Sequence, residues 1–98
     1  MISIYQVVPL KNQNVLLYFS DGTVRLWNYD RLVKKATPNN VYAGLLKDDS
    51  ENYMTVLNNT LAWSFDGTYS PQTCVDVDPL ILFEESKIVE ESDYIRVV

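Results

Sequence analysis

Residues 15–29, VLLYFSDGTVRLWNY, constrain the fold of this chain more than any other stretch, because they predict two strands joined by a tight turn. The pair Asp21-Gly22 separates two runs that are rich in apolar and β-branched residues. A two-residue hairpin loop requires positive φ angles at its centre, which glycine adopts freely and aspartate tolerates. We therefore predict a β-hairpin whose loop is Asp21-Gly22.

A two-residue loop determines which side chains share a face of the hairpin. One face then carries two apolar pairs, and it is predicted to pack on the core. These pairs are Phe19 with Val24 and Leu17 with Leu26. The other face is amphipathic and carries Leu16, Tyr18, Arg25 and Trp27.

The amphipathic face is the predicted partner-binding patch. Leu16 and Trp27 require cover, whereas Tyr18 and Arg25 can lie partly in water. A register shifted by one residue would turn Leu16, Tyr18 and Arg25 inward, and the burial of an arginine argues against that register. We predict that a partner contacts these four residues; the alternative is that a short helix of this chain covers them.

The other strands predict an α+β fold class. Residues 2–8 predict a first strand that ends at Pro9, so that the chain begins with an antiparallel meander. Residues 53–63 predict a second hairpin with Asn58-Asn59 as its turn. We therefore expect two antiparallel hairpins in a small sheet, accompanied by short helices.

Short helices are predicted where capping residues precede apolar positions. Asp30 is the predicted N-cap of a helix over residues 31–35, and Asp78-Pro79 is typical of a second helix start. Residues 41–46 predict one turn of helix, and residues 73–77 predict a short strand. The tail, residues 93–98, resembles a strand and is predicted to add to a sheet edge of this chain or of a second copy.

Charge is unevenly distributed along the 98 residues, which we predict to form a single domain, residues 1–98. Residues 1–47 hold six Lys and Arg against two acids, a net charge of +4, whereas residues 48–98 hold two against eleven, a net charge of −9. The sum is the net charge of −5 for the chain. Either the two halves neutralise each other across the fold, or the acidic half faces a basic partner.

The composition excludes most kinds of catalytic site. The chain has no histidine, which excludes His-based acid–base catalysis, His-activated nucleophiles and His metal ligands. Cys74 is the only cysteine, which excludes an internal disulfide and a cysteine zinc site. The three glycines form no phosphate-binding loop. We therefore predict that the protein is not an enzyme and uses neither a metal nor a cofactor.

One alternative is a metal-dependent enzyme. Carboxylates within a short stretch could together hold Mg²⁺ or Ca²⁺, or act as an acid–base pair. They are Asp66, Asp76, Asp78, Glu84 and Glu85. Turn, cap and solvated helix positions explain most of them without any metal.

A second alternative is a nucleic-acid-binding regulatory domain. Basic and aromatic side chains on a sheet can bind single strands. The basic residues that lie near Tyr18, Trp27 and Tyr29 are Arg25, Arg31, Lys34 and Lys35. Four cations on an acidic chain are thin support, so a protein partner is preferred to nucleic acid.

The sequence also predicts where the protein works. The N-terminal stretch, MISIYQVVPL, lacks a basic region and reaches Pro9 too early for a signal peptide. The longest unbroken apolar run, Leu80 to Phe83, is far shorter than a membrane span. A lone cysteine suits a reducing compartment. We predict a cytoplasmic protein with no membrane contact.

The order of features resembles a family of short bacterial proteins catalogued as domain of unknown function 2442. The resemblance covers about residues 2–84, and residues 85–98 form an extension that is predicted to supply an edge strand. Its motifs are Val8-Pro9-Leu10, VLLYFSDGTVR, Trp27-Asn28-Tyr29-Asp30, the apolar residues 41–46 with a polar bend into Tyr53, Leu61-Ala62-Trp63 and Val75-Asp76-Val77-Asp78-Pro79 leading to Phe83. The link from Trp63 to Asp76 is longer than the family's usual connection.

The resemblance implies a small α+β domain and supplies no catalytic residues. Some relatives carry a helix-turn-helix after this domain, and some are encoded beside a small partner gene in what look like toxin–antitoxin pairs. After Asp93 this sequence has no room for a helix-turn-helix, which weakens the expectation of direct DNA reading. We predict a non-enzymatic protein-interaction module that acts as the acidic, antitoxin-like member of such a pair. We also expect a homodimer that forms through the C-terminal strand.

Overall fold

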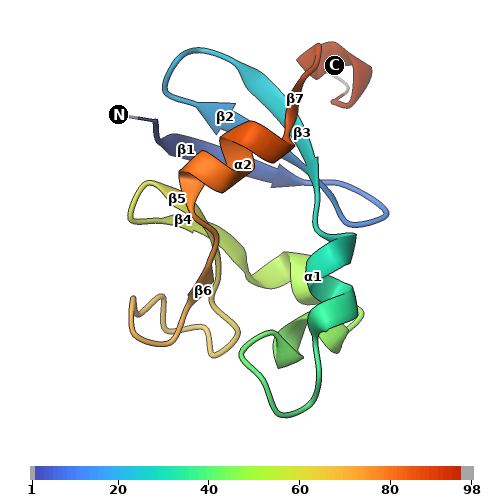
Figure 1. Ribbon diagram of the computed structural model, residues 1–98, viewed down its shortest axis with the longest axis vertical. Helices are drawn as coiled ribbons and strands as arrows, with labels where there is room; N and C mark the ends of the chain where they lie inside the picture. Colours follow the sequence, from blue (N-terminus) through green and yellow to red (C-terminus); the bar gives the residue numbers. More distant parts are fainter. Residues whose placement is uncertain (1, 96–98) are drawn as a thin grey trace.

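The central strand of the molecule, β2 (Asn14–Phe19), is buried along almost its whole length. In an antiparallel strand, successive side chains point to opposite faces, so an unbroken apolar run requires cover on both faces. The computed structural model describes residues 2–95 and places this strand inside a four-stranded sheet (Figure 1). The elements around β2 therefore pack on two sides of it.

The first sheet has the strand order β1-β2-β3-β7, with every neighbouring pair antiparallel. The strand β1 (Ile4–Pro9) precedes β2, and β3 (Val24–Asn28) follows it, which confirms the predicted meander. The edge strand β7 (Lys87–Ile88) comes from the C-terminal part of the chain and pairs with β3. The extension thus adds an edge strand, but at residues 87–88, which the sequence did not indicate.

The predicted loop of the first hairpin is wrong by one residue. Leu16 pairs with Leu26 and Leu17 pairs with Arg25, so the loop has three residues, Ser20-Asp21-Gly22. Only Gly22 has a positive φ angle, at 87°. Asp21 instead accepts a hydrogen bond from the Thr23 amide at 2.9 Å. This is a common three-residue hairpin loop, in which a glycine in the left-handed region closes the turn.

The shifted pairing moves each residue of β3 to the opposite face. Trp27 now lies opposite Val15 and packs in the core, and Arg25 lies on the same inner side, opposite Leu17. Leu26 lies on the outer face beside Leu16. The predicted core pairs, Phe19 with Val24 and Leu17 with Leu26, are therefore wrong, because a one-residue change in register inverts a strand.

The second sheet has the order β4-β5-β6. The strands β4 (Met54–Leu57) and β5 (Thr60–Trp63) form the predicted hairpin, with Val56 opposite Leu61 and Met54 opposite Trp63. Its turn has positive φ angles at Asn58 (52°) and Asn59 (67°), as a two-residue hairpin loop requires. The short strand β6 (Val75–Asp76) pairs with β5 inside the predicted range.

The two α-helices lie where capping residues predicted them. The helix α2 (Pro79–Glu85) begins with Asp78 as N-cap, whose carboxylate accepts a hydrogen bond from the Leu80 amide at 2.8 Å. The helix α1 (Asp30–Lys35) begins at Asp30 itself, so Asp30 is not its N-cap. Tyr29 takes that position without a side-chain bond, and Asp30 forms an ion pair with Lys34 at 2.9 Å.

Three turns of 3-10 helix complete the described chain. They are η1 (Ala43–Leu46), η2 (Ser50–Tyr53) and η3 (Glu91–Asp93). The first confirms the turn of helix that was predicted over residues 41–46. In the predicted tail strand, residues 93–95 are not in a strand, and residues 96–98 lie outside the described residues.

One hydrophobic cluster joins both sheets and α2, which lies across the inner face of the first sheet (Figure 1). The Phe83 ring of α2 meets the Phe19 ring edge-to-face, with 5.4 Å between centroids. The Tyr29 and Trp63 rings make a similar contact between the first hairpin and the second, with 5.3 Å between centroids. The buried members of this cluster are Ile4, Val15, Leu17, Phe19, Trp27, Tyr29, Leu32, Leu45, Leu61, Trp63 and Leu82.

Candidate functional site

The four residues of the predicted partner-binding patch do not form one surface. Leu16 and Tyr18 point to the outer face of the first sheet, whereas Arg25 and Trp27 point inward. Leu16, Tyr18 and Trp27 are only 0%, 6% and 4% exposed, and Arg25 is half-buried. The patch was inferred from the wrong register, so a partner cannot contact all four side chains on one face of this structure.

The helix α2 provides the cover for Arg25. The guanidinium carbon of Arg25 lies 3.9 Å from the centre of the Phe83 ring and 5.6 Å from the centre of the Phe19 ring. The Arg25 Nε donates a hydrogen bond to the Thr23 hydroxyl at 3.0 Å. A guanidinium stacked on aromatic faces keeps its charge at little cost, since it is weakly hydrated. The contact agrees with the alternative that a short helix of this chain covers part of the predicted patch, namely the inward-pointing residues Arg25 and Trp27.

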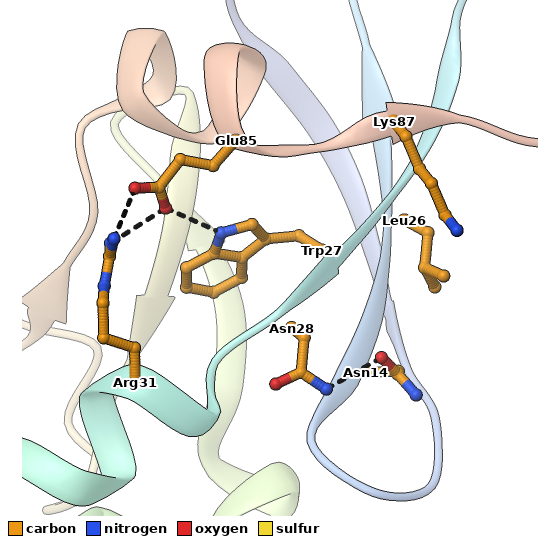
Figure 2. Close-up of a pocket in the computed structure, with 7 residues that line it drawn as sticks. All are labelled: Asn14, Leu26, Trp27, Asn28, Arg31, Glu85 and Lys87. Carbon is orange, nitrogen blue, oxygen red and sulfur yellow. Dashed lines mark hydrogen bonds and ion pairs between the residues drawn. The ribbon is translucent and has the colours of Figure 1, made fainter.

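A groove beside α2 brings together Trp27, Arg31 and Glu85 (Figure 2), and we call it the Glu85 groove. The Glu85 carboxylate accepts a hydrogen bond from the Trp27 indole Nε1 at 3.1 Å and lies 2.7 Å from an Arg31 nitrogen in an ion pair. The hydrogen bond from Arg31 is the main reason why the pKa of Glu85 is lowered. This arrangement joins α1, β3 and α2.

The rest of the Glu85 groove is polar and has a volume of about 400 Å³. Asn28 donates an amide hydrogen bond to the Asn14 side-chain oxygen at 2.9 Å, and Lys87 lies on the far side beside Leu26 (Figure 2). The Arg31 charge is neutralised by Glu85, so Lys87 is the remaining cation of the lining. Sequence reasoning missed this groove, because Trp27 and Glu85 are 58 positions apart and no local pattern links them.

Of the two outer residues, Leu16 and Tyr18, Tyr18 contacts the C-terminal part of the chain. The Tyr18 hydroxyl donates a hydrogen bond to the Glu91 carboxylate, and burial together with that bond raises the pKa of Tyr18 to about 12. The backbone of Val89 donates a hydrogen bond to the Val24 carbonyl at 3.0 Å. Residues 87–89 thus extend the sheet beside β3, and Glu91 reaches Tyr18 on the face opposite α2.

A second groove, of about 650 Å³, surrounds the loop between β1 and β2, and we call it the acidic groove. Glu51 of η2 and Asp93 of η3 both line it, together with Lys11, Asn14 and Tyr94. Glu51 and Asp93 come from distant parts of the acidic half of the sequence. Within residues 2–95, neither carboxylate has an ion pair or a side-chain hydrogen bond to another residue.

Three of the five carboxylates proposed for a metal site have local structural roles. Asp66 accepts hydrogen bonds from the Thr68 amide at 3.0 Å and the Thr68 hydroxyl at 2.8 Å, which lower its pKa to about 2. Asp78 caps α2, and Glu85 binds Arg31. Among residues 2–95, no group of three or more Cys, Asp or Glu side chains could hold a metal ion.

Cys74 is a free thiol that is half-buried, at the rim of a third groove of about 510 Å³. Asp66 and Asp76 line the same groove. Gly44 also lines it, and Phe65 packs so closely on Gly44 that a Cβ there would lie 2.4 Å from the ring. The lining residues of this groove include no amine or imidazole side chain that could serve as a general base for the thiol.

Three of the four cations proposed to bind nucleic acid are engaged within the chain. Arg25 stacks on Phe83, Arg31 pairs with Glu85, and Lys34 pairs with Asp30. Tyr29 and Trp27, the aromatic residues beside them, are buried at 3% and 4% exposure. Stacking of bases requires exposed rings.

No family model, curated protein or solved structure matches this chain. The resemblance to domain of unknown function 2442 therefore stays a prediction. No helix within residues 2–95 is both long enough and apolar enough to cross a membrane.

Proposed function

We propose that this protein is a non-enzymatic interaction module that binds a basic segment of a partner protein in the acidic groove. The observation that carries this proposal is the convergence of Glu51 and Asp93 on one groove. Two carboxylates from separate elements can hold one arginine or two neighbouring cations with charge-assisted hydrogen bonds. Complementary charge also speeds the encounter between partners.

The lining of the acidic groove suits a Lys- or Arg-containing segment. Tyr94 is 39% exposed and offers an aromatic face to a cation, while Pro9 and Leu10 offer apolar surface to its methylene groups. Lys11 lies in the same groove and reduces its negative potential. We therefore expect a partner of moderate affinity whose binding weakens as salt is added.

Other acids of the second half are less available for a partner. Asp66 and Asp78 stabilise a turn and a helix start, and Glu85 and Glu91 bind Arg31 and Tyr18. Because these acids already have structural partners, the acidic groove is a better candidate for the partner site than the acidic surface as a whole. In the bacterial cytoplasm such a module would serve as the acidic, antitoxin-like member of a two-gene pair, which is the role that the family resemblance suggests.

The experiment compares two double variants with the same change in net charge. Glu51→Gln with Asp93→Asn alters the acidic groove, and Asp76→Asn with Glu84→Gln alters exposed acids that do not line it. Binding of an arginine-rich probe peptide is measured by calorimetry at low salt, and partners are recovered from the native host by affinity capture. We expect the first variant to lose affinity about tenfold and the second to keep it.

Two results would contradict the proposal. Equal loss in both double variants would show that binding follows net charge alone and not the groove. If affinity capture from the host recovers no protein partner at low salt, the proposal that this protein is an interaction module is wrong. The engagement of Arg25, Arg31 and Lys34 within the chain gives no support to the nucleic-acid alternative, so we propose no second function.

A further inference from the structure

The outer face of the first sheet is an apolar surface that something must cover. Leu16 is 0% exposed and Tyr18 is 6% exposed, although both point away from α2 and the main core. Antiparallel sheets of this size commonly leave one face to water, with polar side chains on it. Here that face carries Val8, Leu16, Tyr18, Val24 and Leu26.

The segment of residues 87–95, which we call the strap, runs from the β3 edge of this face to the end where β1 meets β2. It joins the sheet at β3 through the pairs Leu26 with Lys87 and Arg25 with Ile88. It then continues to Glu91, which bonds Tyr18 on the central strand. Beyond this point, Asp93 and Tyr94 line the acidic groove beside Pro9 and Asn14, at the end of the sheet where β1 meets β2.

The strap is held by few interactions. Its strand has two residues, and one further backbone bond, from the Val89 amide to the Val24 carbonyl at 3.0 Å, ties it to the sheet. Ile88 is 63% exposed and Tyr94 is 39% exposed, so much of its apolar surface stays in water. Segments with few buried contacts open at lower free energy than the core.

We propose that the strap opens as a unit while the rest of the chain stays folded, and that the strap of a second copy then takes its place. The face already fits this segment, so a second copy reproduces every contact without a new complementary surface. Ser86, which lies between α2 and β7 in an extended conformation with φ −91° and ψ 163°, is the hinge. The product is a strap-exchanged homodimer.

This inference does not rest on the proposed basic partner, and it replaces the expectation that residues 93–98 pair between chains. The pairing element is β7 with the segment that follows it. The surface that the two copies share is the Leu16 and Tyr18 face, where the Tyr5 ring also lies 6.1 Å from the Tyr18 ring. A basic partner in the acidic groove would touch only the far end of the strap.

The first test is hydrogen exchange on the full chain. We expect the Val89 amide to exchange at least tenfold faster than amides of the central strand β2, under conditions in which exchange reports opening equilibria. The variant Tyr18→Phe removes the hydroxyl that binds Glu91 and should accelerate exchange at Val89 about tenfold more. The matched control Tyr5→Phe removes a hydroxyl from the neighbouring ring, 6.1 Å away, and should leave Val89 unchanged.

The second test is native mass spectrometry of a mixture of unlabelled and ¹⁵N-labelled chains at millimolar concentration. We expect a dimer of intermediate mass, formed faster by Tyr18→Phe than by the wild type. Equal exchange of Val89 and β2 amides would show that the strap is an integral part of the core and would overturn the proposal. If the strap opens but only monomer is detected, the proposal that the strap of a second copy binds the exposed face is wrong.

Discussion

The guanidinium of Arg25 stacks on the ring of Phe83, with 3.9 Å between the guanidinium carbon and the ring centroid. This contact joins the first hairpin to α2 and allows a cation to point toward the core side of the sheet. The same Phe83 ring meets Phe19 edge-to-face, so one aromatic residue supports both neighbours. The helix α2 is therefore anchored through Phe83 as well as through the buried Leu82.

Replacement of Phe83 tests this anchor. Phe83→Ala should lower the free energy of unfolding by about 2–3 kcal/mol, because it removes a half-buried ring and leaves Arg25 without its aromatic cover. Urea denaturation measures the change. Ile81→Ala on the same helix is the control, since Ile81 is 44% exposed, and it should cost less than about 1 kcal/mol. Equal costs would show that Phe83 does not anchor the helix.

Glu85→Gln tests the ion pair that joins α1 to α2. The amide can still accept the Trp27 hydrogen bond but loses the charge that holds Arg31, so we expect a loss of about 0.5–1 kcal/mol in unfolding free energy. Glu84→Gln makes the same charge change one residue earlier at an exposed position and serves as the control. High salt should reduce the difference in unfolding free energy between the two variants, and a difference that does not change with salt would argue against an ionic origin.

Gly44→Ala tests a close approach between two segments. A Cβ at residue 44 would lie 2.4–2.5 Å from three atoms of the Phe65 ring, so the ring must shift. We expect a destabilisation of about 1–3 kcal/mol. Adding Phe65→Leu should recover part of that loss in a double-mutant cycle, whereas additive losses would show that the two residues do not clash.

Acid should weaken the fold through carboxylates whose pKa is lowered in the folded state. The pKa of Asp66 is lowered to about 2 by the Thr68 amide and hydroxyl, and that of Glu85 is lowered by Arg31. The stability that these groups supply is present above the unfolded-state pKa, about 4, and is lost as the pH falls toward the folded value. Denaturation at a series of pH values should show that Asp66→Asn loses less unfolding free energy than the wild type as the pH falls.

Alkali should act on Tyr18 in the opposite direction. Its pKa is raised to about 12, so the folded state keeps a proton that the unfolded state releases above about pH 10. The stabilisation is present below pH 10 and disappears as the pH rises toward 12. The stability of the wild type should therefore fall more steeply than that of Tyr18→Phe over this range, and parallel curves would contradict the raised pKa of Tyr18.

Local signals in the sequence predicted most of the elements. Asn58-Asn59 predicted its turn and register correctly, because both residues adopt positive φ angles. Asp78-Pro79 predicted the start of α2, because the carboxylate and the proline act within one turn. These features depend on neighbours in the chain, which the sequence displays directly.

The register of the first hairpin depends on distant residues. The sequence SDGT suits both a two-residue and a three-residue loop, and the cost of an inward arginine favoured the former. Phe83, 58 residues away, removes that cost, and Asp21 caps Thr23 in the longer loop. The candidate grooves were likewise unpredictable, since Glu51 and Asp93 meet only after the whole chain has folded.

Burial of β2 on both faces has a consequence for how the chain is made. Synthesis delivers the meander first, and α2 and the strap only at the end of the described chain. Until then the sheet has neither of its coverings, and β3 presents an unpaired edge next to exposed leucines. During that interval, chaperones and neighbouring nascent chains can bind the apolar faces that α2 and the strap later cover.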